Sequence, residues 1–396
     1  MATFLHDLGI NCALGNNKAQ VLTAIQRQDH STEFLSQRDD LHLDGTPIFV
    51  GEVNAELPCL SAYPSHFNSR NNQLALQAFQ QIAHTFTQLT GNIDKQRIAV
   101  VIGTSTSGIL SGERARSQLL ANGNIPKDYH YATQEMAAPA QFIAHVCGAQ
   151  GPVYSISTAC SSSAKSLATA KMLLESNIAD VVLCGGVDAL SQLTINGFSA
   201  LESVSAGLCN PFGAERDGIN IGEAAALFLM SRNNDSINLC SAGESSDAYH
   251  ISAPHPEGDG AYQSMALALK GANLSASDID YINLHGTGTP KNDDMEAKAV
   301  HRLFGSSVLA SSTKRYTGHT LGAAGALEAG LCWLLLQNQS ENHTLPSNVN
   351  NGKIDPSLAA INLVGDNTTK KVRYCLSNSY AFGGNNISLI LGKNSA

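Results

Sequence analysis

The sequence predicts an α/β protein built from two related halves, and two observations carry this prediction. Short runs rich in β-branched residues recur along the chain, and segments with helical spacing lie between them. Apolar runs that alternate with amphipathic helices are typical of strands buried in a sheet with helices on its faces. The rhythm of strand, glycine turn, small-residue helix and strand returns in the second half, which favours an internal duplication.

The strands and helices are expected in the following order. The expected strands are 97–103, 152–157 and 180–185 in the first half, and 280–285, 372–377 and 387–391 in the second. The expected helices are 72–89, 162–176, 293–304 and 322–337. A polar stretch at 232–236 separates the two sets. We therefore expect an N-terminal half, 1–235, and a C-terminal half, 236–396.

The composition narrows the class of protein. With 396 residues, of which 43% are hydrophobic, the chain is long enough for two to three core-sized units. Charged residues make up only 14%, against about 25% in typical soluble domains. Together with 34 glycines, this predicts close backbone packing and a large buried subunit interface. A net charge of −9 without a Lys/Arg-rich run argues against a nucleic-acid binder.

The cysteine pattern and the hydropathy of the sequence bear on disulfides, metal sites and the location of the protein. The nine cysteines are scattered singly and form no CxxC pair, so we expect neither a disulfide framework nor a metal site. No stretch of 18 or more apolar residues occurs, so no membrane span is expected. The N-terminus lacks a basic region followed by a long apolar run. These features predict a cytoplasmic enzyme.

Cys160 stands where an expected strand meets an expected helix, in the run TACSSS at 158–163. A cysteine at such a junction falls on the first helical turn, where unpaired N–H groups and the positive end of the helix dipole stabilise a thiolate. The turn also holds the sulfur away from the backbone, as in the nucleophile elbow of hydrolases. Most single cysteines are inert small hydrophobes, however, so the junction alone leaves both roles open.

Two histidines lie in glycine-rich turns further along the chain. His285 ends an expected strand and begins the run HGTGTP, and His319 precedes a helix dense in Ala and Gly. Loops at strand ends are a usual place for active-site groups in α/β folds. A lone histidine is more often structural, which is how we interpret the histidines elsewhere. The run GTGTPK lacks the spacing of a phosphate-binding loop, so we expect no nucleotide site.

Cys160, HGTGTP and KxxxxHxxGAAG, in this order, resemble the motifs of elongating β-ketoacyl-acyl carrier protein synthases of types I and II, within the thiolase superfamily. The resemblance covers nearly the whole chain and ends at the run NSYAFGGNN. It implies a thiolase-like, five-layered αβαβα sandwich that dimerises through its first half. The implied reaction is decarboxylative Claisen condensation of malonyl-carrier protein with a Cys-bound acyl chain, in fatty acid or polyene/polyketide-type elongation.

The resemblance also implies roles for the catalytic residues. Cys160 would take the acyl group as a thioester, and His285 and His319 would flank the malonyl thioester. Two N–H donors stabilise the enolate that forms as carbon dioxide leaves. Lys314 would pair with Glu328, and this pair would position the site and balance its charge rather than transfer protons.

Further residues correspond to the family's binding surfaces. Thr287 and Thr289 match residues that hydrogen-bond the pantetheine arm. Phe382 matches the gating aromatic between acyl pocket and malonyl site, and its N–H with that of Cys160 would bind the oxyanion. Lys127 matches a basic residue that docks the acyl carrier protein, although an ordinary solvated lysine is an equally good interpretation. No metal or organic cofactor is implied, because the carrier protein supplies the phosphopantetheine.

The sequence departs from the family at four places. Ala381 replaces a usual Gly in the gating loop, Asn385 replaces Thr, and Gly213 replaces the Asp of a Pro-Phe-Asp turn. Thr106 stands where a bulky Ile or Phe often lines the acyl pocket, which predicts room for a longer, stiffer or branched chain. With the triple serine after Cys160 and the smaller size, this favours a specialised synthase, such as that of an aryl polyene-type cluster.

Other functions are less consistent with these motifs. Thiolases use a second cysteine in a C-terminal Cys-x-Gly motif, whereas this loop reads AFGGNN. The initiating synthases use Cys-His-Asn, and a Cys-His hydrolase would leave His319 and Lys314 unexplained. A non-catalytic, chain-length-factor-like subunit would lack Cys160. The partners expected are an acyl carrier protein and either a second copy, as a homodimer, or a chain-length-factor-like subunit, as a heterodimer.

Overall fold

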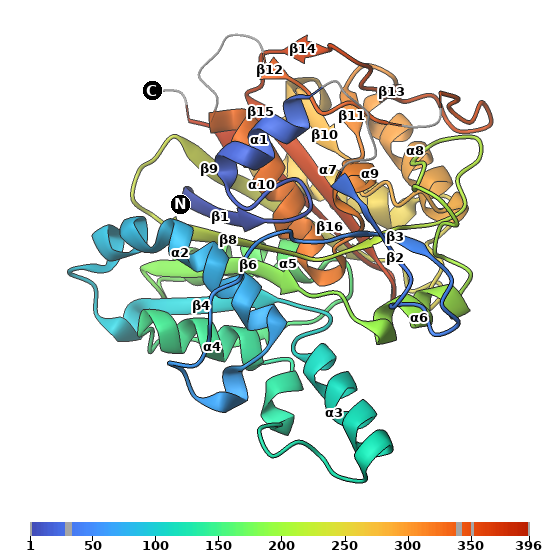
Figure 1. Cartoon of the computed structure of the whole chain (residues 1–396). Coiled ribbons are helices and arrows are strands. Elements are labelled where there is room, and N and C mark those ends of the chain that lie inside the picture. The colour runs from blue at the N-terminus through green and yellow to red at the C-terminus, as the bar shows by residue number, and fades with distance from the viewer. Residues whose placement is uncertain (1, 28–33, 338–342, 350–351, 395–396) are drawn as a thin grey trace.

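A computed structural model describes residues 2–27, 34–337, 343–349 and 352–394 (Figure 1). Among these residues, one large sheet has the strand order β13-β11-β10-β15-β16-β9-β1-β8-β6-β4-β5. The first half contributes β1 (Phe4–Asn11), β4 (Ile98–Gly103), β5 (Val153–Ile156), β6 (Val181–Asp188) and β8 (Ala224–Ser231). The second half contributes β9 (Ile237–Ser246), β10 (Tyr281–Asn283), β11 (Leu309–Ser311), β13 (Asn362–Leu363), β15 (Tyr374–Ala381) and β16 (Asn385–Lys393).

The two halves of this sheet share one topology. In the first half, β1 and β8 are antiparallel, β8 and β6 are antiparallel, and β6, β4 and β5 run parallel. In the second half, β9, β16, β15, β10 and β11 follow in the same spatial order with the same directions. A single pair, Phe4 with Asn238, joins β1 to β9. The expectation of two related halves is therefore confirmed.

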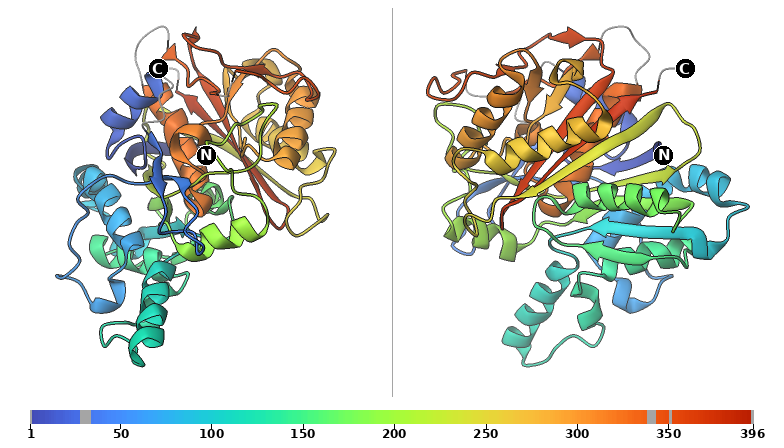
Figure 2. Two further views of the ribbon diagram at one scale, coloured as in Figure 1. Left: turned by 45° about the vertical axis from the view of Figure 1, so that its right-hand side comes forward. Right: turned by 180° about the vertical axis from the view of Figure 1, so that it is seen from behind.

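Helices form three layers around the two halves of the sheet (Figure 2). On the outer face of the first half lie α2 (Arg70–Thr90) and α4 (Ala138–Cys147), and on that of the second lie α7 (Asp259–Ala272) and α8 (Pro290–Phe304). The central layer consists of α5 (Ser162–Glu175) and α10 (Ala324–Gln337), which contact each other and both halves. From Ala324 to Leu336 the residues of α10 are buried and, except for Glu328, apolar, as a central helix requires. The αβαβα sandwich is thus confirmed.

Smaller elements decorate this sandwich. The remaining helices are α1 (Lys18–Gln26), α3 (Ile109–Asn122), α6 (Gln192–Ala200) and α9 (Lys314–Thr317). Short 3₁₀ turns are η2 (Ser65–Phe67), η3 (Lys95–Arg97), η4 (Tyr131–Gln134), η5 (Ala276–Asp278) and η6 (Leu321–Ala323). Two small sheets pair β12 (His343–Thr344) with β14 (Thr369–Lys370), and β2 (Ser36–Arg38) with β3 (Ile48–Gly51) and β7 (Ile221–Gly222). Figure 1 shows α3 projecting from the body of the molecule.

The expected strands and helices are all present, with ends shifted by a few residues. The expectations omitted β1, β8 and β9, which join the two halves at the middle of the sheet. The segment 232–236 connects β8 to β9. Within the described ranges, no helix is both long and apolar enough to cross a membrane.

Candidate active site

Cys160 lies in the turn between β5 and α5. Ala159 has φ +51, in the left-handed region that residues other than glycine rarely adopt. The helix begins at Ser162 with Ser161 as its N-cap, so Cys160 stands one residue before the cap. The expectation that it falls on the first helical turn was wrong by that margin. The left-handed backbone of Ala159 lies directly before Cys160, and the helix begins only after this turn.

The serines that follow Cys160 stabilise this turn. The hydroxyl of Ser162 accepts a hydrogen bond from the N–H of Thr158 at 2.9 Å and donates to the carbonyl of Ala159 at 2.6 Å. The hydroxyl of Ser163 accepts from the N–H of Ala326 at 2.8 Å, which ties α5 to α10. The second and third of these serines therefore have structural partners, Ser162 in the turn itself and Ser163 in α10.

The structure brings Cys160, His285 and His319 together. Nε2 of His319 lies 3.0 Å from the sulfur of Cys160. The rings of His285 and His319 are 5.4 Å apart between centroids and nearly perpendicular, at 85°. All three side chains are buried, with 2% to 6% exposure. Within the described residues, their sulfur and nitrogen atoms lie within 4.8 Å of one another, close enough to act on one substrate.

Lys314 contacts both His285 and Glu328. Its Nζ donates to the main-chain carbonyl of His285 at 2.5 Å and lies 3.5 Å from Nδ1 of the same residue. A positive charge beside Nδ1 favours the tautomer whose proton is on Nε2, so Nε2 of His285 is a donor. Lys314 also forms a buried ion pair with Glu328, on α10. The structure thus contains the Lys314–Glu328 pair that the resemblance implied.

Glu296 holds the loop that carries His285, and the sequence analysis did not single it out. Its carboxylate accepts from the N–H groups of His285 at 2.8 Å and Gly286 at 2.7 Å. The side chain of Asn378 donates to it at 3.3 Å. Glu296 is fully buried on the inner face of α8. It thereby fixes the direction in which His285 leaves the backbone.

Burial controls the charge of the site. Desolvation lowers the pKa of His285 and of His319 well below 6.5, and the ammonium of Lys314 lowers both further. Desolvation raises the pKa of Cys160 to about 11, although Lys314 and the N–H of Phe382 oppose this shift. It also raises the pKa of Glu328 to about 7, against the effect of Lys314. The resting site therefore contains a neutral thiol and two neutral imidazoles.

Phe382 contributes both backbone and side chain. It follows β15, and its N–H and that of Cys160 are hydrogen-bond donors to the sulfur of Cys160. The ring of Phe382 contacts that of Phe198, with centroids 5.6 Å apart. Both N–H groups thus lie beside the sulfur of Cys160. Neighbouring Ala381 is a strand residue without positive φ, so this conformation needs no glycine there.

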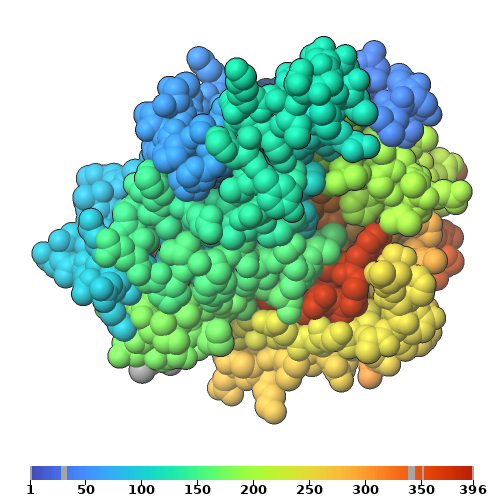
Figure 3. Space-filling view, turned by 90° about the horizontal axis from the view of Figure 1, so that it is seen from below, coloured from blue at the N-terminus to red at the C-terminus, as the bar shows by residue number. Residues whose placement is uncertain are grey.

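A cavity of about 370 Å³ leads to these groups. Its lining includes Cys160, both histidines and Phe382, together with Thr287 and Thr289, whose hydroxyls lie 2.9 Å apart. Figure 3 shows a hollow whose surface includes part of the C-terminal segment, in red, between green-yellow and yellow segments of the two halves. The two threonines that match pantetheine-binding residues are thus in the same cavity as Cys160, His285 and His319.

Thr106 lies outside the lining of this cavity and is hydrogen-bonded to a buried carboxylate, that of Asp188. Its hydroxyl donates to the carboxylate of Asp188 at 2.7 Å, and its N–H donates to the same oxygen at 2.7 Å. Thr104 and Ser105 also donate to Asp188, which is fully buried. Burial raises the pKa of Asp188, and these four donors oppose the shift. The hydroxyl of Thr106 is therefore directed at a carboxylate.

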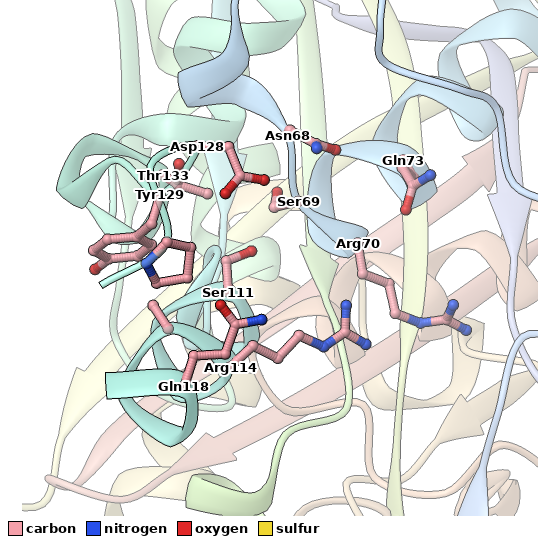
Figure 4. A pocket seen from close by; sticks show the side chains of 12 residues that line it. Asn68, Ser69, Arg70, Gln73, Ser111, Arg114, Gln118, Asp128, Tyr129 and Thr133 are labelled. Carbon is pink, nitrogen blue, oxygen red and sulfur yellow. The ribbon is translucent and has the colours of Figure 1, made fainter. Parts of the chain in front are cut away.

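Lys127, the proposed docking residue, lies away from the Cys160 cavity. Lys127 is exposed in the loop after α3, and its neighbours Pro126 and Asp128 line a separate polar cavity of about 200 Å³ beside α2 and α3 (Figure 4).

At Gly213, a Cβ atom would meet the side-chain amide of Asn210 at 2.1 Å, so an aspartate does not fit this turn as it stands. Nothing in the structure explains Asn385.

Comparisons with known proteins show the family to which the chain belongs. Residues 9–236 match the family described as Beta-ketoacyl synthase, N-terminal domain, and residues 238–350 match Beta-ketoacyl synthase, C-terminal domain. The chain is 36% identical over 261 residues to 3-oxoacyl-[acyl-carrier-protein] synthase 2 of Rhizobium meliloti, and this match spans 61% of each chain. It is 32% identical over 317 residues to the protein of the same name from Staphylococcus aureus, which covers 75% of each.

A solved structure is similar over almost the full length. It is the complex of a ketosynthase with its chain length factor from Xenorhabdus doucetiae, one chain of which is 42% identical to this one with a TM-score of 0.94. The match covers 99% of this chain and 98% of the other.

Proposed function

Since the chain belongs to the β-ketoacyl synthase family, we propose that it elongates carrier-bound acyl chains with Cys160, His285 and His319 as its catalytic residues. The observation that carries this proposal is the meeting of a buried thiol, two neutral imidazoles and two backbone N–H donors in one cavity. The reaction is acyl transfer followed by carbon–carbon bond formation.

In the first step the sulfur of Cys160 attacks the carbonyl carbon of an acyl thioester. Because the resting thiol is protonated, its proton must leave as the new C–S bond forms. Nε2 of His319, 3.0 Å away, accepts this proton in the tautomer with Nδ1–H. The imidazolium then donates the proton to the departing pantetheine thiolate as the old C–S bond breaks, which returns His319 to its neutral form.

In the second step the malonyl thioester loses carbon dioxide. The electron pair of the broken C–C bond passes into an enolate, whose oxygen receives hydrogen bonds from Nε2–H of His285 and of His319. His319 must now present its other tautomer. Its Nδ1 has no hydrogen-bond partner within the described part of the chain, so nothing there holds the ring in one tautomer.

The enolate carbon then attacks the carbonyl carbon of acyl-Cys160. The oxyanion that forms accepts hydrogen bonds from the N–H groups of Cys160 and Phe382. When it collapses, the C–S bond breaks, the β-ketoacyl thioester leaves on the carrier, and the sulfur takes up one proton from solvent. All electrons for the new bond come from the decarboxylation, so we propose that no metal or organic cofactor takes part.

A carrier assay tests this function. Acyl-carrier and malonyl-carrier proteins are incubated with the chain, with and without a chain-length-factor subunit, and the β-ketoacyl product is measured by mass spectrometry. We expect product from the wild type and none from Cys160→Ala. Product formation by Cys160→Ala at the wild-type rate would contradict the proposed nucleophile. Absence of product from the wild type under both conditions would favour a non-catalytic subunit.

We propose a chain-length-factor-like subunit as the dimer partner. The ketosynthase from Xenorhabdus doucetiae was solved with its chain length factor, and the chains are similar over nearly their full length. In the described part of this chain β5 pairs only with β4, and its four residues are all partly exposed. A strand edge of this kind readily pairs with another chain. Native mass of the co-expressed subunits tests the proposal: a homodimer in the presence of the factor contradicts it.

Lys127 is our proposed contact for the acidic carrier protein. It is exposed beside α3, the helix that projects from the body. Reversing its charge should weaken carrier binding, and more so at low salt, because exposed charges act mainly through steering. The measurement is carrier affinity of Lys127→Glu, with Lys270→Glu on α7 as the control. Equal affinities for the two variants would remove Lys127 from the docking surface.

The proposal also covers the cellular location of the enzyme and the pathway that it serves. We propose that the enzyme works in the cytoplasm and serves a specialised pathway of the aryl polyene type. The sequence supports a long or stiff acyl chain because Thr106 is small where the family often has a bulky residue, although it lies outside the lining of the Cys160 cavity. Comparing turnover of polyene and saturated acyl-carriers of equal length tests this: a preference for saturated primers would contradict it.

A further inference from the structure

Lys291 is the one lysine or arginine among the described residues that line the Cys160 cavity. It is the second residue of α8, directly after Pro290, and its side chain is exposed. It forms no hydrogen bond or ion pair with the part of the chain that the structure describes, whereas Lys298 on the same helix pairs with Asp294 and Glu257. A cation is therefore available at the wall of the substrate cavity.

The position of this lysine is unfavourable for the helix itself. The first turn of a helix carries the positive end of its dipole, so acidic residues are stabilising there and cations are not. Asp293 is the acidic residue of this turn, and its carboxylate is engaged with the N–H groups of Phe212 and Gly288. The charge of Lys291 thus has no structural role in α8.

The other charges of the cavity are negative. Glu202, Asp217 and Asp247 line it as well. Asp247 accepts from Asn386 at 2.7 Å and Asp217 accepts from the N–H of Ala206 at 3.1 Å, but neither pairs with a cation among the described residues. An anionic group that enters this cavity is repelled by these carboxylates, and Lys291 is the side chain that offsets them.

We propose that Lys291 binds the phosphate of the phosphopantetheine arm. This inference rests on the proposed function, in which the arm passes Thr287 and Thr289 to reach Cys160. Lys291 follows these threonines in the sequence and is more exposed than either, and all three residues line the same cavity. Its compact ammonium on a flexible stem suits a phosphodiester whose position changes as substrates enter and leave.

Two small substrates isolate this contact from carrier docking. Decarboxylation of malonyl-phosphopantetheine and of malonyl-pantetheine, which lacks the phosphate, is followed with the wild type, Lys291→Gln and Lys298→Gln. We expect the wild type and Lys298→Gln to have a KM roughly fivefold lower for the phosphorylated substrate, the size of a partly exposed ion pair. In Lys291→Gln the two KM values should be about equal, with kcat on malonyl-pantetheine unchanged.

The outcomes separate this inference from the proposed function. A wild type that decarboxylates both substrates with equal KM overturns the role of Lys291, as does a Lys291→Gln variant that keeps the preference. A wild type that decarboxylates neither refutes the proposed function. In that case calorimetric binding of phosphopantetheine against pantetheine decides the role of Lys291: equal affinities, or an unchanged difference in Lys291→Gln, overturn it.

Discussion

Nε2 of His319 lies 3.0 Å from the sulfur of Cys160, whereas His285 lines the same cavity with its ring 5.4 Å from that of His319 between centroids. The two histidines therefore stand in different relations to the thiol of Cys160. His319 is in hydrogen-bond contact with the thiol, and His285 is held from behind by Lys314 and Glu296. The two half-reactions should respond differently to changes at the two positions.

Replacing His285 should separate loading from condensation. His285→Ala removes one of two donors to the enolate, so malonyl decarboxylation should fall by about 10²–10³-fold. Acyl transfer to Cys160 should persist, because the thiol keeps its neighbour His319. Loading is measured by intact mass and decarboxylation by carbon dioxide release, with His301→Ala on α8 as the control. Loss of loading in His285→Ala would contradict this division of roles.

The thiol of Cys160 should behave as a weak acid. Its pKa is raised to about 11 by burial, whereas hydrogen bonds to Ser61 lower the pKa of the exposed Cys59. The thiolate fraction grows about tenfold per pH unit below the pKa. Iodoacetamide should thus label Cys59 first, and its rate at Cys160 should still rise between about pH 8 and 10. A Cys160 rate that levels off near neutral pH would instead indicate a resting thiolate–imidazolium pair with His319.

Removing one member of the Lys314–Glu328 pair should lower the free energy of unfolding more than removing both. Glu328→Gln leaves a buried ammonium without its carboxylate, which should lower the free energy of unfolding by about 3–5 kcal/mol. The double variant Lys314→Met/Glu328→Gln should recover part of that loss but stay inactive, because His285 loses its support. Urea unfolding at fixed pH measures both.

The single variant Lys314→Met adds a pH dependence to this test. The pKa of Glu328 is about 7 in the folded state and rises further without Lys314, against 4.5 for the ordinary group. The unfolded chain then binds fewer protons than the folded one between these values, so stability falls as pH rises through this window. Lys314→Met should be more stable at pH 6 than at pH 8. An unfolding free energy that falls from pH 8 to pH 6 would contradict this.

Thr106 should set the length of the acyl chain. Thr106→Phe introduces a ring where the family often has a bulky residue, and should shift the preference to shorter acyl-carriers. Thr106→Val keeps the volume but removes the hydroxyl that Asp188 binds, so it should cost about 1 kcal/mol of stability and leave the preference unchanged. Competition among acyl-carriers of increasing length reports the preference. A shift in Thr106→Val equal to that in Thr106→Phe would assign the effect to Asp188.

Much of this fold and site could be predicted because the pattern of apolar runs is local. The strand–cysteine–helix junction and the glycine-rich turns around the histidines are visible in short segments of sequence. The position of Cys160 one residue before the helix N-cap could not be predicted, because it depends on the left-handed backbone of Ala159.

Residues that act through long-range contacts were missed for a physical reason. Glu296 lies in the charged run DDMEAK, which is typical of a solvated helix face, and only the packing of α8 turns it toward His285. Asp188 ends a strand whose partners at Thr104–Thr106 are more than 80 residues away in sequence. Carboxylates of this kind are identified by the donors that surround them, and the sequence does not show those donors as neighbours.

Intact-protein mass after mixing the chain with an acyl-carrier protein tests the central claim most directly. The account predicts a gain of one acyl group in the wild type, in His285→Ala and in Lys127→Glu given enough time, and no gain in Cys160→Ala. An acyl group that appears in Cys160→Ala, or a wild type that stays unmodified with several chain lengths and with a chain-length-factor subunit present, would contradict it.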